Sequence, residues 1–169
     1  GRVLKGFDAK KRFETGTHIL KALEMASPYT WDLAMRDRFG NNPFRPGGVR
    51  ATVIVGNTGY GGIKSLANED GSDGTVYVST ANLNCAHLNI AFPPKGKKPQ
   101  TSVLKPAKGD TAFLVLDNYN HTSITLKDES PGDHPALVRS IVKALNVSNA
   151  EDFKTWVSDC AAATRRVMK

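Results

Sequence analysis

The sequence predicts an α/β fold in which helices flank a mostly parallel sheet. Two segments, 49–55 and 111–117, are nearly continuous apolar runs rich in β-branched residues. Such runs are typical of strands that are covered on both faces. Helical patterns and long connections surround them, as in layered α/β folds. Because two buried strands are few for a parallel sheet, we expect the chain to form only the C-terminal half of such a fold. We expect a single domain, with a helical segment at 1–48 and the sheet at 49–169.

Size and composition are those of one soluble domain. The chain has 169 residues, of which 40% are hydrophobic and 23% are charged, and this excludes a disordered or fibrous protein. No apolar run reaches the ~20 residues that a membrane-spanning helix needs. The first residues contain no signal segment and no initiator methionine. We therefore expect a soluble protein without a membrane span, favour the cytoplasm, and expect a chain cut from something longer.

The N-terminal segment is predicted to be helical. Apolar residues at helical spacing indicate a helix over 9–26. Ser27-Pro28 is expected to end it, because proline disfavours the helical conformation at the residue before it. A second short helix is expected at 31–35, and glycines and prolines predict a loop at 40–48.

The middle of the chain alternates strands and loops. The strand at 49–55 runs into a glycine-rich loop at 56–62, whose spacing matches neither common nucleotide-binding glycine motif. Alternating apolar residues predict strands at 75–80 and 86–92. The stretch 93–110 is rich in proline, lysine and glycine and is expected to be an exposed excursion.

Two helices are predicted at the C-terminal end. An apolar stripe from Leu137 to Leu145 follows Pro135, a residue that suits the first turn of a helix. A second stripe contains Phe153, Trp156, Val157, Cys160 and Ala161 at helical spacing. Ser148 and Glu151 have the spacing of a capping box in front of it.

The net charge of +7 raises the question of an anionic partner. The densest basic run is Lys95, Lys97 and Lys98, which lies among prolines. No aromatic residues interleave with it, as they would in a surface that stacks on bases. We interpret it as a solvated loop and expect no nucleic-acid partner.

The two cysteines, Cys85 and Cys160, lie far apart in the sequence. We expect both to be buried thiols, with a disulfide between them as the alternative. A structural zinc site needs about four ligands, and the cysteines and scattered histidines do not supply one. No metal and no cofactor is therefore expected.

Two loops carry groups that suit catalysis. Asp70 and Asp73 follow the strand at 49–55, and His121 directly follows the strand at 111–117. Active sites of open α/β sheets form in the loops beyond the carboxyl ends of the strands. An acid followed by a histidine is the order of the last two members of a Ser–Asp–His triad in α/β-hydrolases.

Three short motifs resemble lipase-like α/β-hydrolases. Asp73-Gly74-Thr75-Val76 is similar to the turn that carries the acid in that family, and the sequence at 120–124, NHTSI, is similar to its histidine loop. The sequence at 26–33, ASPYTWDL, resembles a segment between nucleophile and acid in some bacterial lipase or esterase-like proteins. The resemblance implies that Asp73 is the acid and His121 the base, with Asp70 as the second choice of acid. Gly59 and Tyr60 would lie at a substrate entrance.

The chain departs from that family at the nucleophile. No G-x-S-x-G elbow is present, and Ser65 in the sequence GIKSLA lacks the flanking glycines. The resemblance implies a serine hydrolase acting on carboxylic esters or lipids, with a serine outside this chain. We expect the chain alone to be inactive.

Two other functions remain open at the level of sequence. The first is a non-enzymatic, basic α/β binding module. The second is a half-fold that completes itself by assembly, since an unpaired sheet edge recruits another strand. The partner would be the missing N-terminal segment or a second copy of the chain.

Overall fold

The computed structural model describes residues 19, 21–22, 24, 27–94, 96–107, 109–127 and 130–169. The chain divides between Pro43 and Phe44 into two compact units, which are described separately here. Among the described residues, no helix is both long and apolar enough to cross a bilayer.

The first unit contains the helix α2 (Pro28–Ala34), followed by one π-helical turn at Met35–Phe39. The Ser27 hydroxyl caps α2 by accepting a hydrogen bond from Thr30 N (3.1 Å), and Pro28 occupies its first turn. The expected short helix is therefore confirmed. Most of the helix expected at 9–26 lies outside the described residues.

A small parallel sheet forms the centre of the second unit. Strand β1 (Thr52–Gly56) pairs in parallel with β4 (Ala112–Leu116), with Thr52 opposite Ala112 and Gly56 opposite Leu116. The two buried strands were predicted from their apolar runs, and the mixed α/β class is confirmed. Val55, Leu114 and Val115 are nearly inaccessible to solvent.

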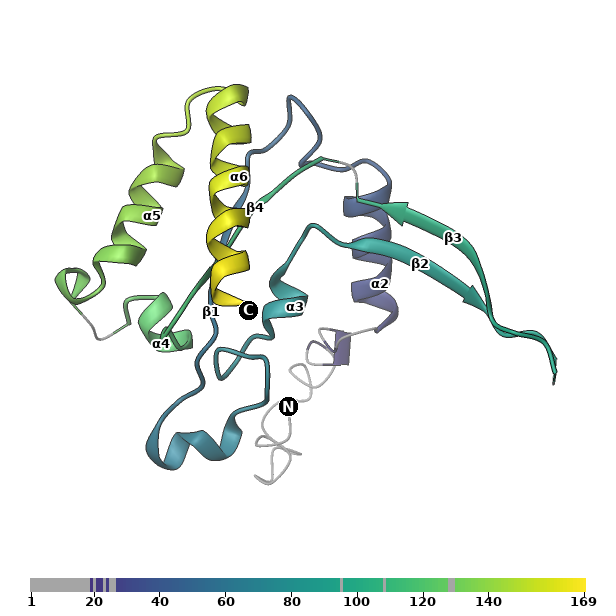
Figure 1. Cartoon of the computed structure of the whole chain (residues 1–169), viewed down its shortest axis with the longest axis horizontal. Coiled ribbons are helices and arrows are strands. Elements are labelled where there is room, and N and C mark those ends of the chain that lie inside the picture. The colour runs from purple at the N-terminus through teal and green to yellow at the C-terminus, as the bar shows by residue number, and fades with distance from the viewer. Residues whose placement is uncertain are drawn as a thin grey trace. The chain divides into compact units, whose positions relative to one another are not determined.

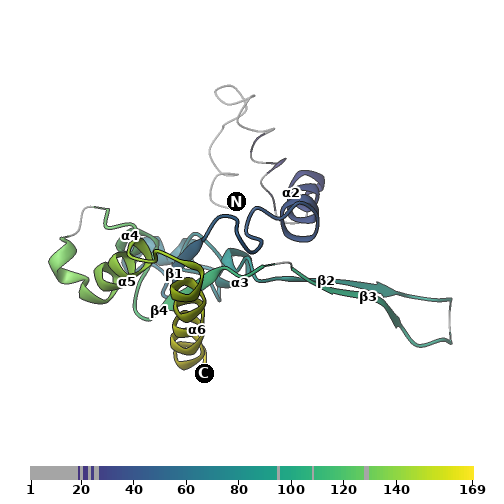
Figure 2. The ribbon, with the colours of Figure 1, turned by 90° about the horizontal axis from the view of Figure 1, so that it is seen from above.

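A second, antiparallel pair is formed by β2 (Ala86–Ala91) and β3 (Gln100–Pro106). It projects as a long hairpin from the rest of its unit in both views (Figures 1 and 2). The strand expected at 86–92 is confirmed. The interpretation of 93–110 as a plain excursion is wrong in part, because the chain returns through it as β3.

The strand expected at 75–80 is also wrong. An isolated bridge joins Ser72 to Tyr77, and the short helix α3 (Val78–Ala81) follows directly. The cause is local, because the Asp73 carboxylate accepts hydrogen bonds from the backbone N–H groups of Thr75 and Val76. A side chain that binds its own backbone in this way competes with strand pairing.

Two helices close the chain, α5 (Pro135–Leu145) and α6 (Ala150–Val167). Pro135 lies in the first turn of α5, as predicted. The cap of α6 was placed one residue too early: Asn149, not Ser148, accepts the hydrogen bond from Asp152 N (2.9 Å). Ser148 instead donates to the Asp152 carboxylate.

The core lies between α6 and the parallel pair. Trp156 and Cys160 on α6 are buried against Ala112 and Leu114 on β4. The indole N–H of Trp156 also donates to Thr52 Oγ1 (3.0 Å) at the beginning of β1. This packing fixes the sheet, and with it the loops at the carboxyl ends of the two strands.

The cysteine prediction holds for one residue. Cys160 is buried, but Cys85 is exposed, and neither forms a disulfide. Cys85 lies directly before β2, at the base of the projecting hairpin, where no layer covers it.

Candidate active site

The candidate site lies where β1 and β4 end side by side. Gly56, the last residue of β1, approaches the chain that leaves β4 so closely that a Cβ atom there would collide with the carbonyl oxygen of Tyr119. That carbonyl also accepts a hydrogen bond from Thr58 N (3.0 Å). The lack of a side chain at Gly56 therefore lets the two loops meet.

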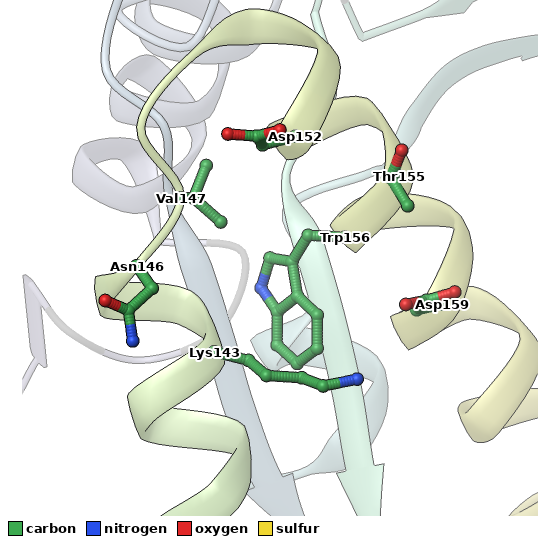
Figure 3. Close-up of a pocket in the computed structure, with 7 residues that line it drawn as sticks. All are labelled: Lys143, Asn146, Val147, Asp152, Thr155, Trp156 and Asp159. Atoms are coloured by element: carbon green, nitrogen blue, oxygen red, sulfur yellow. The ribbon is translucent and has the colours of Figure 1, made fainter.

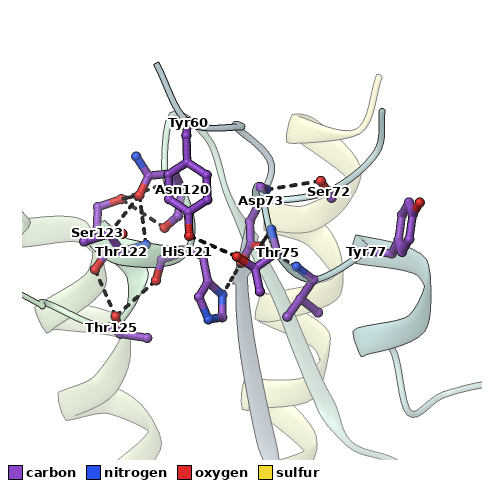
Figure 4. A network of polar contacts seen from close by, with 12 residues as sticks. Tyr60, Ser72, Asp73, Thr75, Tyr77, Asn120, His121, Thr122, Ser123 and Thr125 are labelled. Atoms are coloured by element: carbon purple, nitrogen blue, oxygen red, sulfur yellow. Dashed lines mark hydrogen bonds and ion pairs between the residues drawn. The ribbon is translucent and has the colours of Figure 1, made fainter. Parts of the chain in front are cut away.

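Asp73 and His121 face each other across this junction (Figure 4). Asp73 Oδ2 lies 3.1 Å from His121 Nδ1. The backbones are joined as well, since His121 N donates to Asp73 O (2.8 Å). The Asp73 side chain is 1% exposed and that of His121 is 37% exposed. A buried carboxylate thus contacts a histidine whose ring reaches solvent.

The acid is fixed by its own turn. Asp73 Oδ1 accepts hydrogen bonds from Thr75 N (3.0 Å) and Val76 N (2.8 Å), which leaves Oδ2 for the histidine. Asp73 N donates to Val76 O (3.0 Å) and closes the turn. The carboxylate thus has three N–H partners, from Thr75 N, Val76 N and the His121 ring, as a buried polar group requires.

The histidine is fixed by a capped helical turn. His121 is the first residue of α4 (His121–Ile124), and Asn120 caps that helix. Asn120 Oδ1 accepts from Thr122 N (2.9 Å) and Ser123 N (3.0 Å). Ser123 Oγ in return accepts from Asn120 N (2.9 Å), which completes a reciprocal capping box.

A second set of hydrogen bonds ties the two strand ends together. Asn57 Nδ2 donates to Asp117 Oδ1 (2.9 Å), and Asn118 N donates to Asn57 Oδ1 (3.1 Å). Asn118 has a φ of 63°, a left-handed conformation that asparagine tolerates. The chain thereby reverses sharply between β4 and the histidine.

Tyr60 lies beside the acid turn. Its hydroxyl shares a hydrogen bond with Thr75 Oγ1 (2.9 Å), and its ring occupies the space that a side chain at Gly74 would need. Its backbone N and O both bind the Asn68 side chain (2.8 Å each). Gly59 makes room for that side chain, because a Cβ there would collide with it. Gly59 and Tyr60, which were expected at a substrate entrance, thus pack against the loop at 68–75 that carries Asp73.

Asp70, the second choice of acid, lies elsewhere in the loop. It is exposed, and the structure gives it no hydrogen bond to His121. The structure therefore brings together Asp73 and His121 but not Asp70 and His121.

The pair offers a proton acceptor, and the described residues place no hydroxyl group on it. A carboxylate only accepts hydrogen bonds, so His121 Nδ1 donates to Asp73 and Nε2 is left as a proton acceptor. Within the described residues, no group hydrogen-bonds Nε2. The hydroxyls of Ser65, Ser72 and Ser123 bind backbone oxygens instead. No cluster of three or more metal-ligating side chains occurs in the described part of the chain.

A shallow hollow of about 240 Å³ lies between α5 and α6 (Figure 3). Lys143 and Trp156 face each other in it, with the ammonium 6.0 Å from the ring centroid. Because Trp156 contacts the beginning of β1, this hollow lies at the opposite end of the strands from His121. It plays no part in the candidate site.

Two supporting residues were missed from the sequence, Asn57 and Asn120. Asn120 had a readable signal, since an asparagine three residues before a serine at a strand end suits a helix cap. Asn57 had none, because its partner Asp117 is sixty positions away.

The fold is shared with solved structures of a phospholipase. Phospholipase PlaB from Legionella pneumophila in complex with thio-NAD superposes on 88% of this chain with a TM-score of 0.65 and 24% sequence identity. A second structure of phospholipase PlaB covers 88% of the chain with a TM-score of 0.68 and 22% identity. The chain spans about a third of the length of these structures, 33% and 32%. At this identity the likeness concerns the fold.

No protein-family model matches the chain, and no curated protein sequence matches it. The likeness to these lipolytic structures therefore rests on the arrangement of the backbone, not on a sequence family.

Proposed function

We propose that the chain carries the acid and the base of a serine hydrolase of the α/β-hydrolase type. The observation that supports this most strongly is the contact between the buried Asp73 carboxylate and His121 Nδ1, at the carboxyl ends of adjacent parallel strands. Chain order, strand position and hydrogen bond all agree with that assignment.

In the proposed reaction His121 acts through Nε2. It takes the proton from a serine hydroxyl as the serine oxygen attacks an ester carbonyl, and then gives this proton to the leaving alcohol. A water molecule, deprotonated by His121, then attacks the acyl-enzyme in the same way. The carboxylic acid product is released and the serine hydroxyl is restored. Asp73 holds the ring orientation and stabilises the imidazolium that forms in each half.

The nucleophile is proposed to lie outside residues 1–169. The described serines named above use their hydroxyls in loop hydrogen bonds, and no G-x-S-x-G elbow occurs in the sequence. The sheet offers a place for the missing part. Strand β1 pairs with β4 on one side and with no other strand among the described residues, so its second edge is where preceding strands would join.

The proposed substrates are lipid esters. The two structural neighbours are phospholipases by name, and the half-exposed ring of His121 is accessible from solvent. The bond that we expect to be cleaved is the carboxylic ester of a phospholipid.

The test is phospholipid hydrolysis by the natural full-length protein. We expect release of fatty acid by the unaltered protein and a loss of at least about 1,000-fold in kcat for His121→Gln, with the melting temperature retained. A His121→Gln protein with ordinary turnover would contradict the proposal. The 169-residue chain by itself should show no turnover that depends on His121.

A further inference from the structure

The β2–β3 hairpin has no role in the proposed reaction, yet it is the most prominent surface feature of its unit. Its two strands pack chiefly on each other. The pair projects beyond the helices and the parallel sheet of its own unit in both views (Figures 1 and 2).

The hairpin has one apolar face. Leu88 is paired with Leu104, and Ile90 lies two positions along β2 on the same side. Phe92 continues this alternation just beyond the strand. These side chains are 49%, 68%, 41% and 78% exposed, respectively. Contiguous exposed apolar groups of this kind mark contact surfaces.

The opposite face is more polar. Its cross-strand pairs are His87 with Lys105, Asn89 with Val103 and Ala91 with Gln100, so Val103 (41% exposed) and Ala91 are its apolar members. The hairpin is therefore amphipathic across its thickness, like a half-buried sheet that lacks the layer over one face.

The charge of the region has a single sign. Residues 74–109 contain no aspartate or glutamate and no arginine, but five lysines, at positions 95, 97, 98, 105 and 108. They account for +5 of the chain's net charge of +7. Lys97 and Lys98 are exposed in the connection between the strands, a few positions after Phe92.

These features favour a lipid surface over other partners. A second copy of the hairpin offers no carboxylate to any of its lysines in any register, so self-pairing would bring like charges together. Nucleic acid would satisfy the lysines but would leave Leu88, Ile90 and Leu104 in water. An anionic bilayer matches both properties, since it offers phosphates above an apolar layer.

We propose that the hairpin at 86–106 docks the protein on anionic phospholipid membranes. The apolar face enters the boundary between headgroups and acyl chains, and Lys97 and Lys98 bind the phosphates. This role does not depend on the action of Asp73 and His121.

The test is co-sedimentation with vesicles of phosphatidylcholine alone or mixed with phosphatidylglycerol, with no turnover measured. We expect the chain to bind the mixed vesicles and to be released by salt. Lys97→Gln with Lys98→Gln should weaken partitioning about 30-fold, which corresponds to about 2 kcal/mol at about 1 kcal/mol per lysine. Lys127→Gln with Lys154→Gln removes the same charge from exposed sites away from the hairpin and should weaken it much less.

Two further variants test the apolar face. Leu88→Ser with Leu104→Ser should reduce binding at unchanged net charge. Phe92→Trp keeps the hairpin apolar, and its additional fluorescence should shift to the blue on mixed vesicles. A tryptophan signal that stays unshifted would show that the hairpin remains in water and would overturn the proposal.

Other results would also overturn it. These are equal binding by the hairpin and control variants, no preference for anionic vesicles, a dimer that Leu88→Ser with Leu104→Ser dissociates, and binding to duplex DNA in place of vesicles. His121→Gln should bind vesicles like the unaltered chain, so a failure of the proposed hydrolase leaves this test intact.

Discussion

At the scale of single residues, two aspartates in one loop have different environments, and these favour Asp73 as the proposed acid. Asp73 is buried and hydrogen-bonded to His121, whereas Asp70 is exposed. We predict that Asp73→Asn lowers kcat of the proposed full-length hydrolase by about 10,000-fold, because an amide does not hold the imidazole in its productive tautomer. Asp70→Asn is the matched control and should retain activity. If steady-state assays showed a larger loss of kcat for Asp70→Asn than for Asp73→Asn, Asp70 would be the acid.

The two thiols should differ in reactivity. Burial raises the pKa of Cys160 to about 12, so at pH 8 only about one molecule in 10,000 carries the reactive thiolate there. Cys85 is exposed. In a native alkylation time course read by mass spectrometry, we expect one rapid modification, at Cys85, with Cys160 reacting only after denaturation. Rapid native labelling at Cys160 would show that the packing of α6 is not as described.

Residue types, their order and the resemblance predicted Asp73 and His121 as a pair, and the structure places their side chains in contact. The choice between Asp73 and Asp70 rested on the resemblance and on a strand expected at 75–80, which the structure does not contain. Both aspartates precede a glycine, and burial is not visible in the sequence. The same limit explains Cys85, whose exposure follows from the projection of a hairpin and not from its neighbours in the chain.

At the scale of elements, the one-turn helix α4 depends on its cap. Asn120 satisfies two backbone N–H groups of a helix that is too short to be stable by itself. We predict that Asn120→Ala lowers the free energy of unfolding by about 1 kcal/mol. It should also reduce kcat in the proposed full-length hydrolase, whereas Asn120→Asp should retain the cap and restore much of the rate. Equal effects of both substitutions would exclude a capping role.

Helix α6 closes one edge of the sheet. On β4, Ala112 N bonds Ala51 O toward β1, so the alternate residues Phe113 and Val115 face the other edge. There Thr164 Oγ1 accepts from Val115 N (3.0 Å) and donates to Phe113 O (3.1 Å). The unpaired edge of the described sheet is thus that of β1. If another strand completes the sheet, as the sequence suggested, we expect it to pair with this edge.

We predict that Thr164→Val lowers the free energy of unfolding by about 1–3 kcal/mol, because it leaves a buried N–H and C=O without partners. Thr155→Val changes an exposed threonine on the same helix and serves as the control. Urea denaturation measures both. If the two variants unfold alike, the closure by Thr164 contributes nothing to stability.

Elements with long periodic patterns were predictable. The stripes of α5 and α6 and the apolar runs of β1 and β4 carry their own signal. The structure of the segment at 75–80 was not predictable from its composition, which is typical of a strand. The Asp73 side chain binds the backbone there and forms a turn instead. Strand β3 was missed because proline and lysine dominate its surroundings, while its pairing with β2 is set by a partner earlier in the chain.

At the scale of the whole molecule, the parallel pair brings the loop at 68–77 and the loop that carries His121 together at one end of the sheet. The fold superposes on 88% of this chain but on only about a third of the neighbouring structures, 33% and 32%. The two proposed functions lie in different parts of the second unit. The ends of β1 and β4 are proposed to supply acid–base chemistry, and the β2–β3 hairpin is proposed to supply contact with the membrane.

The most direct test of the central claim is to map the serine that reacts with a fluorophosphonate probe in the natural full-length protein. We predict one modified serine, located before residue 1 of this chain, and no modification in the His121→Gln variant. The reason is that the serine oxygen attacks phosphorus only when a base removes its proton. A modified serine within residues 1–169, or labelling that persists without His121, would contradict the account.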